Sequence, residues 1–254
     1  MYKPERKTLS QNFLHNQGLI ASLVHRSLIT ADDVVIEIGS GKGSITEQLL
    51  GVAKKVIAIE LDSNLVATLS KRIADNPNLE IHQADFLLFS LPKTPYKVFA
   101  NIPFAIEKEI LRKLLSDDNP PQDSYLVVDK RLALSLSGKP HENQFSLLHK
   151  PWFDFAVYHH FKRSDFAPIP DVEAVMLHMH QKEAPLLPVT AKRNWYAFVA
   201  MGFNQGRPLY ANLRKILSKE QLTQISNKIS LSLKTKPSYV SLEQWIRLYS
   251  SLYA

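Results

Sequence analysis

The stretch Val34-Val35-Ile36-Glu37-Ile38-Gly39-Ser40-Gly41-Lys42-Gly43 decides the fold of this chain. It begins as a short run of β-branched residues, which predicts a buried strand. Three glycines at alternate positions follow, and they let the backbone turn tightly and approach a ligand. A helical pattern through Ile45, Leu49 and Leu50 comes next. The stretch therefore predicts a strand, a glycine turn and a helix, which together begin an α/β sheet.

The alternation of strand and helix patterns continues along the chain. Helical spacing of apolar residues is expected over 17–29, 62–75 and 105–115. Short apolar runs predict six further strands, at residues 56–59, 81–84, 97–100, 125–128, 152–158 and 174–179. We therefore expect an α/β fold with a mostly parallel, Rossmann-like sheet of seven strands. Ligands of such sheets bind beyond the carboxyl ends of the strands.

Composition and charge indicate two domains. The segment 183–188 is rich in proline and reads as a linker, so we expect a catalytic domain over 1–183 and a small helical domain over 184–254. Residues 181–254 carry 11 Lys and Arg against 3 Asp and Glu, whereas residues 27–180 carry 16 against 20. A basic tail on a near-neutral body favours a polyanionic partner, with ordinary solubility charge as the alternative.

Several classes of protein are disfavoured by composition. The chain has no Cys, which excludes a disulfide framework, a thiolate metal site and a Cys nucleophile. No apolar run approaches the length of a membrane span, and Met1 to Leu14 lacks the apolar core of a signal peptide. We expect a cytoplasmic protein with no membrane association.

The glycine turn favours S-adenosylmethionine as a cofactor. Its spacing is Gly-x-Gly-x-Gly, which does not match the dinucleotide or P-loop fingerprints. Glu37 before Gly39 and Gly41 suits a ligand with a cationic amino-acid end. Glu60, at the end of the second strand, can accept both ribose hydroxyls. Asp85 can take the adenine amine while Phe86 covers the ring; an ordinary strand-to-helix turn is the alternative for the glycines alone.

The tetrapeptide Asn101-Ile102-Pro103-Phe104 follows a fourth strand and suits reaction at a planar amine. An exocyclic adenine amine is a poor nucleophile because its lone pair is delocalised into the ring. The Asn101 side-chain oxygen and the Ile102 carbonyl could accept its hydrogen bonds. The face of Phe104 could stabilise positive charge on the nitrogen. This site requires no strong base.

The chain resembles the rRNA adenine-N6 methyltransferases, which include Erm-type and KsgA-type enzymes, over about residues 8–175. The resemblance rests on six motifs in order: Ser10-Gln11-Asn12-Phe13-Leu14, Glu37 to Gly43, Glu60-Leu61-Asp62, Gln83-Ala84-Asp85-Phe86, Asn101 to Phe104, and Phe166-Ala167-Pro168-Ile169-Pro170-Asp171-Val172. It implies a base flipped out of its stack, since a paired adenine hides its amine.

The resemblance implies a role for each matching position. Asn12 and Leu14 would close over the methyl donor. Gly39 with Gly41, Glu60 with Leu61, and Asp85 with Phe86 would bind its methionine, ribose and adenine parts. Asn101 would bind donor and target amine, with Ile102 and Pro103 beside it. Phe104 would stack on the target adenine and Phe166 would pack on the other face, unless Phe166 is a plain core aromatic.

Two features point to different branches of the family. Ile102 and Phe104 favour an Erm-type 23S rRNA enzyme, which would confer resistance to macrolides, lincosamides and streptogramin B. The segments Phe203 to Arg207 and Asn212 to Arg214 are similar to KsgA-type chains, which dimethylate 16S rRNA. We expect a monomer acting on 23S rRNA before subunit assembly is complete. The sequence is also compatible with a DNA adenine methyltransferase or with a non-catalytic RNA-binding factor on the same fold.

The remaining charged clusters suggest RNA contacts. Lys3, Arg6 and Lys7 resemble a basic arm, and Arg207, Arg214 and Lys215 could grip phosphates, although a solvated helix face is the alternative for the latter. His178 and His180 fall on one face of a strand, but the sequence offers no evident third ligand. We therefore expect no metal site and interpret these histidines as surface or RNA-facing residues.

Overall fold

The computed structural model describes residues 12–73, 75–204, 207–232 and 234–253. The chain divides into two compact units. The first comprises residues up to Lys130 together with Ala156–Gln181, and the second comprises Arg131–Phe155 and the residues from Lys182 onward. The second unit thus contains an internal segment besides the C-terminal residues that the sequence pattern assigns to a helical domain.

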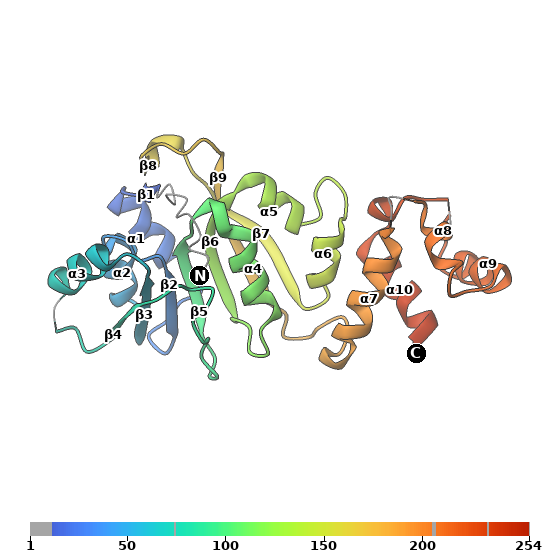
Figure 1. The fold of residues 1–254 in the computed structure, drawn as a ribbon, viewed down its shortest axis with the longest axis horizontal. Helices are drawn as coiled ribbons and strands as arrows, with labels where there is room; N and C mark the ends of the chain where they lie inside the picture. The colour runs from blue at the N-terminus through green and yellow to red at the C-terminus, as the bar shows by residue number, and fades with distance from the viewer. Residues whose placement is uncertain (1–11, 74, 205–206, 233, 254) are drawn as a thin grey trace, which may run out of the picture. The chain divides into compact units, whose positions relative to one another are not determined.

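A seven-stranded sheet forms the centre of the first unit (Figure 1). The strands lie in the order β4-β3-β2-β5-β6-β9-β7. Pairing is parallel from β4 through β6 and antiparallel between β6 and β9. Their bounds are β2 (Val34–Ile38), β3 (Lys55–Glu60), β4 (Leu79–Gln83), β5 (Lys97–Asn101), β6 (Asp123–Asp129), β7 (Phe153–His160, whose residues up to Phe155 belong to the second unit) and β9 (Ala174–Gln181). The predicted Rossmann-like sheet is confirmed.

Helices of the first unit begin at capping residues that the sequence provides. Asn16 accepts the amide of Leu19 before α1 (Gln17–His25), and Asp62 accepts that of Asn64 before α3 (Ser63–Arg72). Gly43, with a left-handed backbone, precedes α2 (Ser44–Leu50). The turn η1 (Phe104–Ile106) leads directly into α4 (Glu107–Ser116), so the predicted helix over 105–115 is a 3-10 turn followed by a helix.

A two-stranded sheet joins two of the sequence motifs that lie far apart in the chain. β1 (Phe13–Leu14) pairs antiparallel with β8 (Phe166–Ala167), with Phe13 opposite Ala167 and Leu14 opposite Phe166. The main chain of His15 continues the ladder by donating to the carbonyl of Asp165. The N-terminal motif is therefore held against the Phe-Ala-Pro motif.

The second unit is helical. Trp195 on α7 donates its indole N–H to the carbonyl of Leu147 on α6, 2.8 Å away, which ties the internal segment to the C-terminal helices. Trp195, Phe198 and Trp245 are fully buried at its centre. The helices are α5 (Lys130–Leu136, beginning on the last residue of the first unit), α6 (Gln144–His149), α7 (Lys192–Gly202), α8 (Leu209–Leu213), α9 (Lys219–Lys228) and α10 (Leu242–Tyr253). Within the described residues, no helix has the length and apolarity needed to cross a membrane.

Candidate active site

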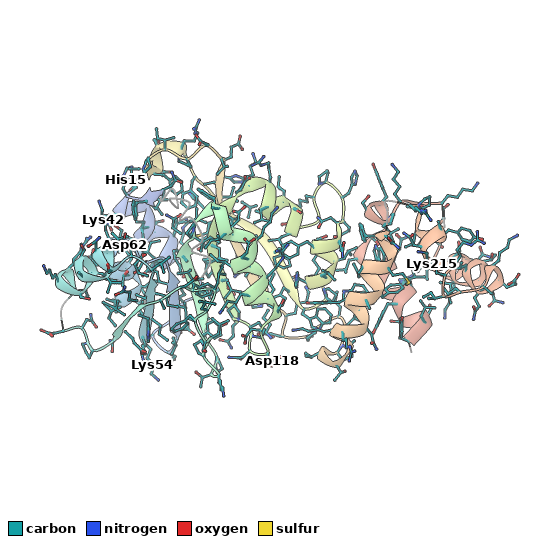
Figure 2. All side chains as sticks on the ribbon, viewed as in Figure 1. His15, Lys42, Lys54, Asp62, Asp118 and Lys215 are labelled. Atoms are coloured by element: carbon teal, nitrogen blue, oxygen red, sulfur yellow. The ribbon has the colours of Figure 1, made fainter. Side chains whose placement is uncertain are left out.

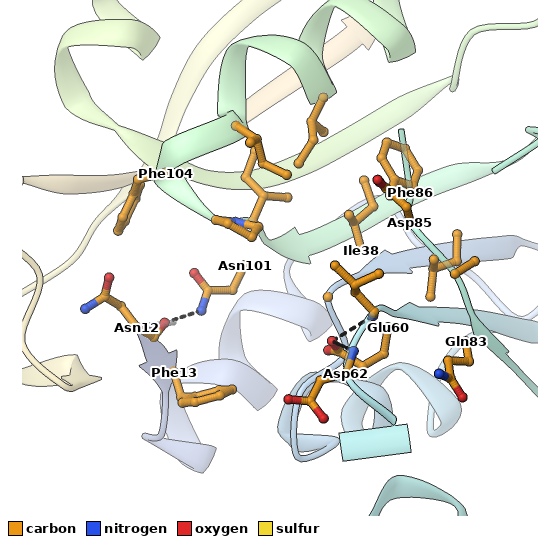
Figure 3. A pocket seen from close by; sticks show the side chains of 18 of the residues that line it. Asn12, Phe13, Ile38, Glu60, Asp62, Gln83, Asp85, Phe86, Asn101 and Phe104 are labelled. Atoms are coloured by element: carbon orange, nitrogen blue, oxygen red, sulfur yellow. Dashed lines mark hydrogen bonds between the residues drawn. The ribbon is translucent and has the colours of Figure 1, made fainter. Parts of the chain in front are cut away.

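A cavity of about 600 Å³ opens at the carboxyl ends of β2, β3, β4 and β5 (Figure 3). Each strand contributes a residue at or just beyond its last position, as the parallel sheet requires. The lining residues are Asn12, Phe13, Ile38, Gly39, Ile59, Glu60, Leu61, Asp62, Ser63, Asn64, Gln83, Ala84, Asp85, Phe86, Asn101, Ile102, Pro103, Phe104, Ile106 and Ile110. Most of the predicted site residues therefore meet in one place.

The glycine turn lies beside β2, where Gly39 lines the cavity and Gly41 is not among the described residues that do so. Gly39 has a φ of +72°, and a Cβ built there would meet no atom within 4 Å, so the turn leaves open space above it. Gly41 has a φ of +56°, and a Cβ there would lie 2.9 Å from the ring of Phe13. Both positions favour glycine because their φ angles are positive. At Gly41 a side chain would also collide with the ring of Phe13. The open space at Gly39 fits a ligand that approaches the backbone.

Glu60 is fixed by the backbone around it. Its Oε2 accepts the amide of Gly41 at 2.9 Å, and its Oε1 accepts the amides of Leu61 at 2.8 Å and Asp62 at 3.0 Å. An ionised carboxylate offers about four lone-pair positions, so acceptor capacity remains for a ligand hydroxyl. The side chain is almost fully buried but reaches the cavity wall. This arrangement suits a ribose.

Glu37 lies away from the cavity lining, contrary to the interpretation that it meets the cationic end of the ligand. It is 1% exposed, and its Oε2 accepts a hydrogen bond from the Thr46 hydroxyl at 2.5 Å. Burial, opposed by this bond and aided by the nearby Glu60, raises the pKa of Glu37 to about 8. The group is therefore protonated at neutral pH and joins β2 to α2 as a neutral carboxylic acid.

Asp85 and Phe86 form the wall beyond β4. Asp85 Oδ1 accepts the amide of Leu87 at 2.8 Å, which holds the carboxylate in a turn that faces the cavity. The ring of Phe86 is 5% exposed and has the Lys113 ammonium 5.4 Å from its centre. An acceptor beside a fixed aromatic ring matches the amine and the face of an adenine, as the sequence predicts.

Asn101 is positioned by a chain of hydrogen bonds from the N-terminal motif. Its Nδ2 donates to the carbonyl of Asn12 at 2.6 Å, as Figure 3 shows, and Asn12 Nδ2 donates to the carbonyl of Pro168 at 2.9 Å. Because the amide nitrogen is engaged, the Asn101 Oδ1 serves as the acceptor of this side chain. Three motifs that are remote in sequence therefore converge on the orientation of one side chain.

Phe104 and Phe166 occupy different environments. Phe104 lines the cavity and is partly exposed. Phe166 is 2% exposed and packs edge-on against Phe161, with ring centres 5.2 Å apart. Neither Phe166 nor Leu14 is among the described residues that line the cavity. Both belong to the buried cluster against which Phe104 packs, so Phe166 is a core aromatic.

Several lining residues belong to the sequence motifs, although the sequence predicted no role for them. Phe13 covers Gly41, Asp62 lies near Glu60 (Figure 3), and Gln83 is opposite Glu60 in the register of β3 and β4. Their place in the sequence, within two residues of residues that had an expected role, could have identified them as cavity residues. Ile106 and Ile110 were not anticipated, because a helical apolar pattern does not show which of its residues face the cavity.

The predicted RNA-binding residues lie outside this cavity. Arg207, Arg214 and Lys215 are exposed on the second unit, where Figure 2 labels Lys215. Lys3, Arg6 and Lys7 fall outside the described residues. The role of both groups stays a prediction.

Comparisons with known proteins agree with the site. A family model described as ribosomal RNA adenine dimethylase matches residues 3–253. An "rRNA adenine N-6-methyltransferase" of Bacillus anthracis is 30% identical over 95% of this chain and 85% of its own length. A "Ribosomal RNA small subunit methyltransferase A" of Acaryochloris marina is 29% identical over 98% of this chain and 97% of its own.

Solved structures share the fold. The "23S rRNA methyltransferase ErmE" superposes with a TM-score of 0.85 at 24% identity, covering 96% of this chain and all of that one. A "dimethyladenosine transferase from Plasmodium falciparum" gives 0.79 at 23% identity, covering 93% and 95%. Enzymes of this family use S-adenosylmethionine, and the open glycine turn and acidic wall fit that cofactor. The chain belongs to the ribosomal RNA adenine dimethylase family and is an rRNA adenine N6-methyltransferase.

Proposed function

We propose that this enzyme methylates the N6 amine of an adenine in 23S rRNA, and so confers resistance to macrolides, lincosamides and streptogramin B. The observation that carries the choice of substrate is the pair Ile102 and Phe104 in the tetrapeptide at the cavity, which is typical of Erm-type enzymes. A 16S rRNA substrate is the second candidate, favoured by the similarity of Asn212 to Arg214 to KsgA-type chains.

The walls of the cavity would bind the donor in three parts. Gly39 and Gly41 would lie along its methionine part, Glu60 and Leu61 would meet the ribose, and Asp85 with Phe86 would hold the adenine. Asn12 would close the cavity from above, since it already contacts Asn101. When bound, S-adenosylmethionine supplies a methyl group on a positively charged sulfur.

Asn101 and Ile102 would orient the target amine. The Asn101 Oδ1 and the Ile102 carbonyl accept hydrogen bonds from the amine, which favours a tetrahedral nitrogen with an available lone pair. The ring of Phe104 stacks on the flipped adenine and stabilises the positive charge that develops on the nitrogen. The proton is acidic once the new N–C bond has formed, so water can remove it. Leu14 and Phe166 would support the Phe104 ring from the core.

The second unit would hold the RNA backbone. Arg207, Arg214 and Lys215 are exposed cations in a segment rich in basic residues, and such side chains bind phosphates without reading sequence. Lys3, Arg6 and Lys7 would add a basic arm. We propose a cytoplasmic monomer that acts on rRNA before subunit assembly is complete.

The substrate choice is tested by offering the enzyme purified 23S rRNA and 16S rRNA separately with tritiated donor. We expect label in 23S rRNA alone, with primer extension placing it at one adenine and mass spectrometry counting the methyl groups. Expression in a susceptible host should raise macrolide and lincosamide resistance. Label confined to 16S rRNA, with unchanged drug susceptibility, would select the second candidate.

A further inference from the structure

Asp123, His178 and His180 form a cluster in the first unit that the methyl-transfer site does not use. His178 Nε2 lies 2.8 Å and His180 Nδ1 lies 2.9 Å from the same oxygen, Asp123 Oδ1. All three ligand atoms fall within 4.8 Å of one another. The sequence showed no third ligand because Asp123 is remote in the chain. The antiparallel register of β6 and β9 supplies it by placing Asp123 opposite His180.

The electrostatic surroundings of this cluster favour a cation. Lys97 Nζ lies 2.9 Å from Asp33 Oδ2, also donates to the carbonyl of Leu28, and stands 3.8 Å from Asp123 Oδ2. Lys97 thus lies on the Oδ2 side of the Asp123 carboxylate, whereas the Oδ1 of Asp123 faces the two imidazoles. Two carboxylates and one ammonium leave a net charge of −1 beside two imidazoles.

The two imidazoles are held in place yet open to solvent. The His178 ring stacks on Tyr125, with ring centres 4.5 Å apart and planes 4° apart. The Tyr125 hydroxyl accepts the amide of Leu28, which fixes the tyrosine in turn. Exposed fractions rise from 6% for the Asp123 side chain to 19% for His178 and 37% for His180. An ion can therefore enter past His180 and meet ligands whose rings are already oriented.

We propose that Asp123, His178 and His180 bind a zinc ion. Two imidazole nitrogens and one carboxylate oxygen are a common ligand set for zinc, with water in the fourth position. Bond lengths of about 2.0–2.2 Å at tetrahedral angles separate ligand atoms by about 3.3 Å. The two Asp–His separations therefore need to widen by about half an ångström, and the separation of the two histidine nitrogens, which is within 4.8 Å, needs to narrow by up to about 1.5 Å. Each imidazole keeps one proton and moves it to its other ring nitrogen, which frees the coordinating lone pair.

The zinc would stabilise the sheet and take no part in methyl transfer. Asn101 pairs with Val127 on β6, four residues beyond Asp123. A strand rises about 3.3 Å per residue, which separates the two sites by about 13 Å along β6. The ion would join the start of β6 to the end of β9 at the opposite end of the sheet from the cavity. This inference is independent of the choice of rRNA substrate.

The test uses the full chain, freed of any affinity tag and treated with a chelator. Zinc is titrated against a chromophoric chelator, and cobalt is added separately to give visible bands typical of tetrahedral coordination. The variants are His180→Gln and Asp123→Asn. Because the His180 side chain is exposed, its replacement should leave the fold intact. His160→Gln is the matched control, because His160 is an exposed histidine on β7 near the end of the sheet where β9 begins.

We expect one zinc per chain, and a rise in the thermal unfolding midpoint when zinc is added. His180→Gln and Asp123→Asn should weaken zinc binding about tenfold or more and abolish the rise, since loss of even an outer-shell partner costs about 10–100-fold. His160→Gln should bind zinc as the wild type does, and His180→Gln should keep its methyl-transfer rate. Absence of zinc binding, or equal affinity in His180→Gln, would overturn the proposal.

Discussion

Replacing Glu37 by Gln should make the stability of the folded protein less sensitive to rising pH. Burial raises the pKa of Glu37 from 4.5 to about 8. The folded protein therefore keeps this proton between those values, whereas the unfolded chain releases it. Stability from the protonated group is fully present below pH 4.5 and is lost as the pH rises to 8. A Gln amide keeps an acceptor for the Thr46 hydroxyl without this dependence.

The size of the effect follows from the shift. Each pH unit between 4.5 and 8 should remove about 1.4 kcal/mol from the free energy of unfolding of the wild type through this group. From pH 5.5 to pH 7.5, the variant should therefore gain about 3 kcal/mol relative to the wild type. This change of about 3 kcal/mol is as large as the effect of a strongly destabilising single substitution. It is also a sizeable part of the free energy of unfolding of a typical domain, so unfolding experiments can measure it.

Urea unfolding of both proteins at the two pH values measures this difference. Glu109→Gln serves as the matched control, since Glu109 is an exposed glutamate on α4. A difference between Glu37→Gln and the wild type that stays constant from pH 5.5 to pH 7.5 would refute the reasoning. It would mean that Glu37 is ionised in the folded protein.

Three further groups of substitutions test the proposed function. Phe104→Ala should lower kcat/KM on rRNA about 10- to 100-fold, the range expected for losing one stacked base, while Phe104→Tyr should be tolerated; near-normal turnover of Phe104→Ala would remove the stacking role. Gly41→Ala should weaken donor binding measured by calorimetry, because φ is +56° and the new Cβ would press on Phe13; unchanged affinity would contradict this. Arg214→Ala with Lys215→Ala should weaken rRNA binding and flatten its salt dependence, with donor affinity unchanged, whereas an unaltered salt slope would argue against phosphate contacts.

The sheet and most of the cavity could be predicted from local sequence. Each strand carried its own apolar run, and the parallel arrangement then placed Gly39, Glu60, Asp85 and Asn101 at one edge. The pairing of β1 with β8 could not be predicted, because strands of two residues leave no periodic pattern. The helices within 130–149 were missed as well, since they are short and follow one another closely.

The sequence also did not predict which residues of a motif face the core and which face the cavity. Glu37 and Gly39 are two residues apart, yet one is buried under α2 and the other faces the cavity. Motif membership did not reveal that difference, nor that Phe166 packs into the core while Phe104 reaches the cavity. Asp123 escaped notice because only the register of β6 against β9 brings it to the histidines.

The central claim is that Asn101 joins the donor to the target amine, and Asn101→Ala tests it most directly. Donor affinity by calorimetry and methyl transfer to rRNA should be measured on the same preparation. We predict that transfer is abolished while donor affinity falls only modestly, because Gly39, Glu60 and Asp85 still line the cavity. Full methyl transfer by Asn101→Ala would contradict the account.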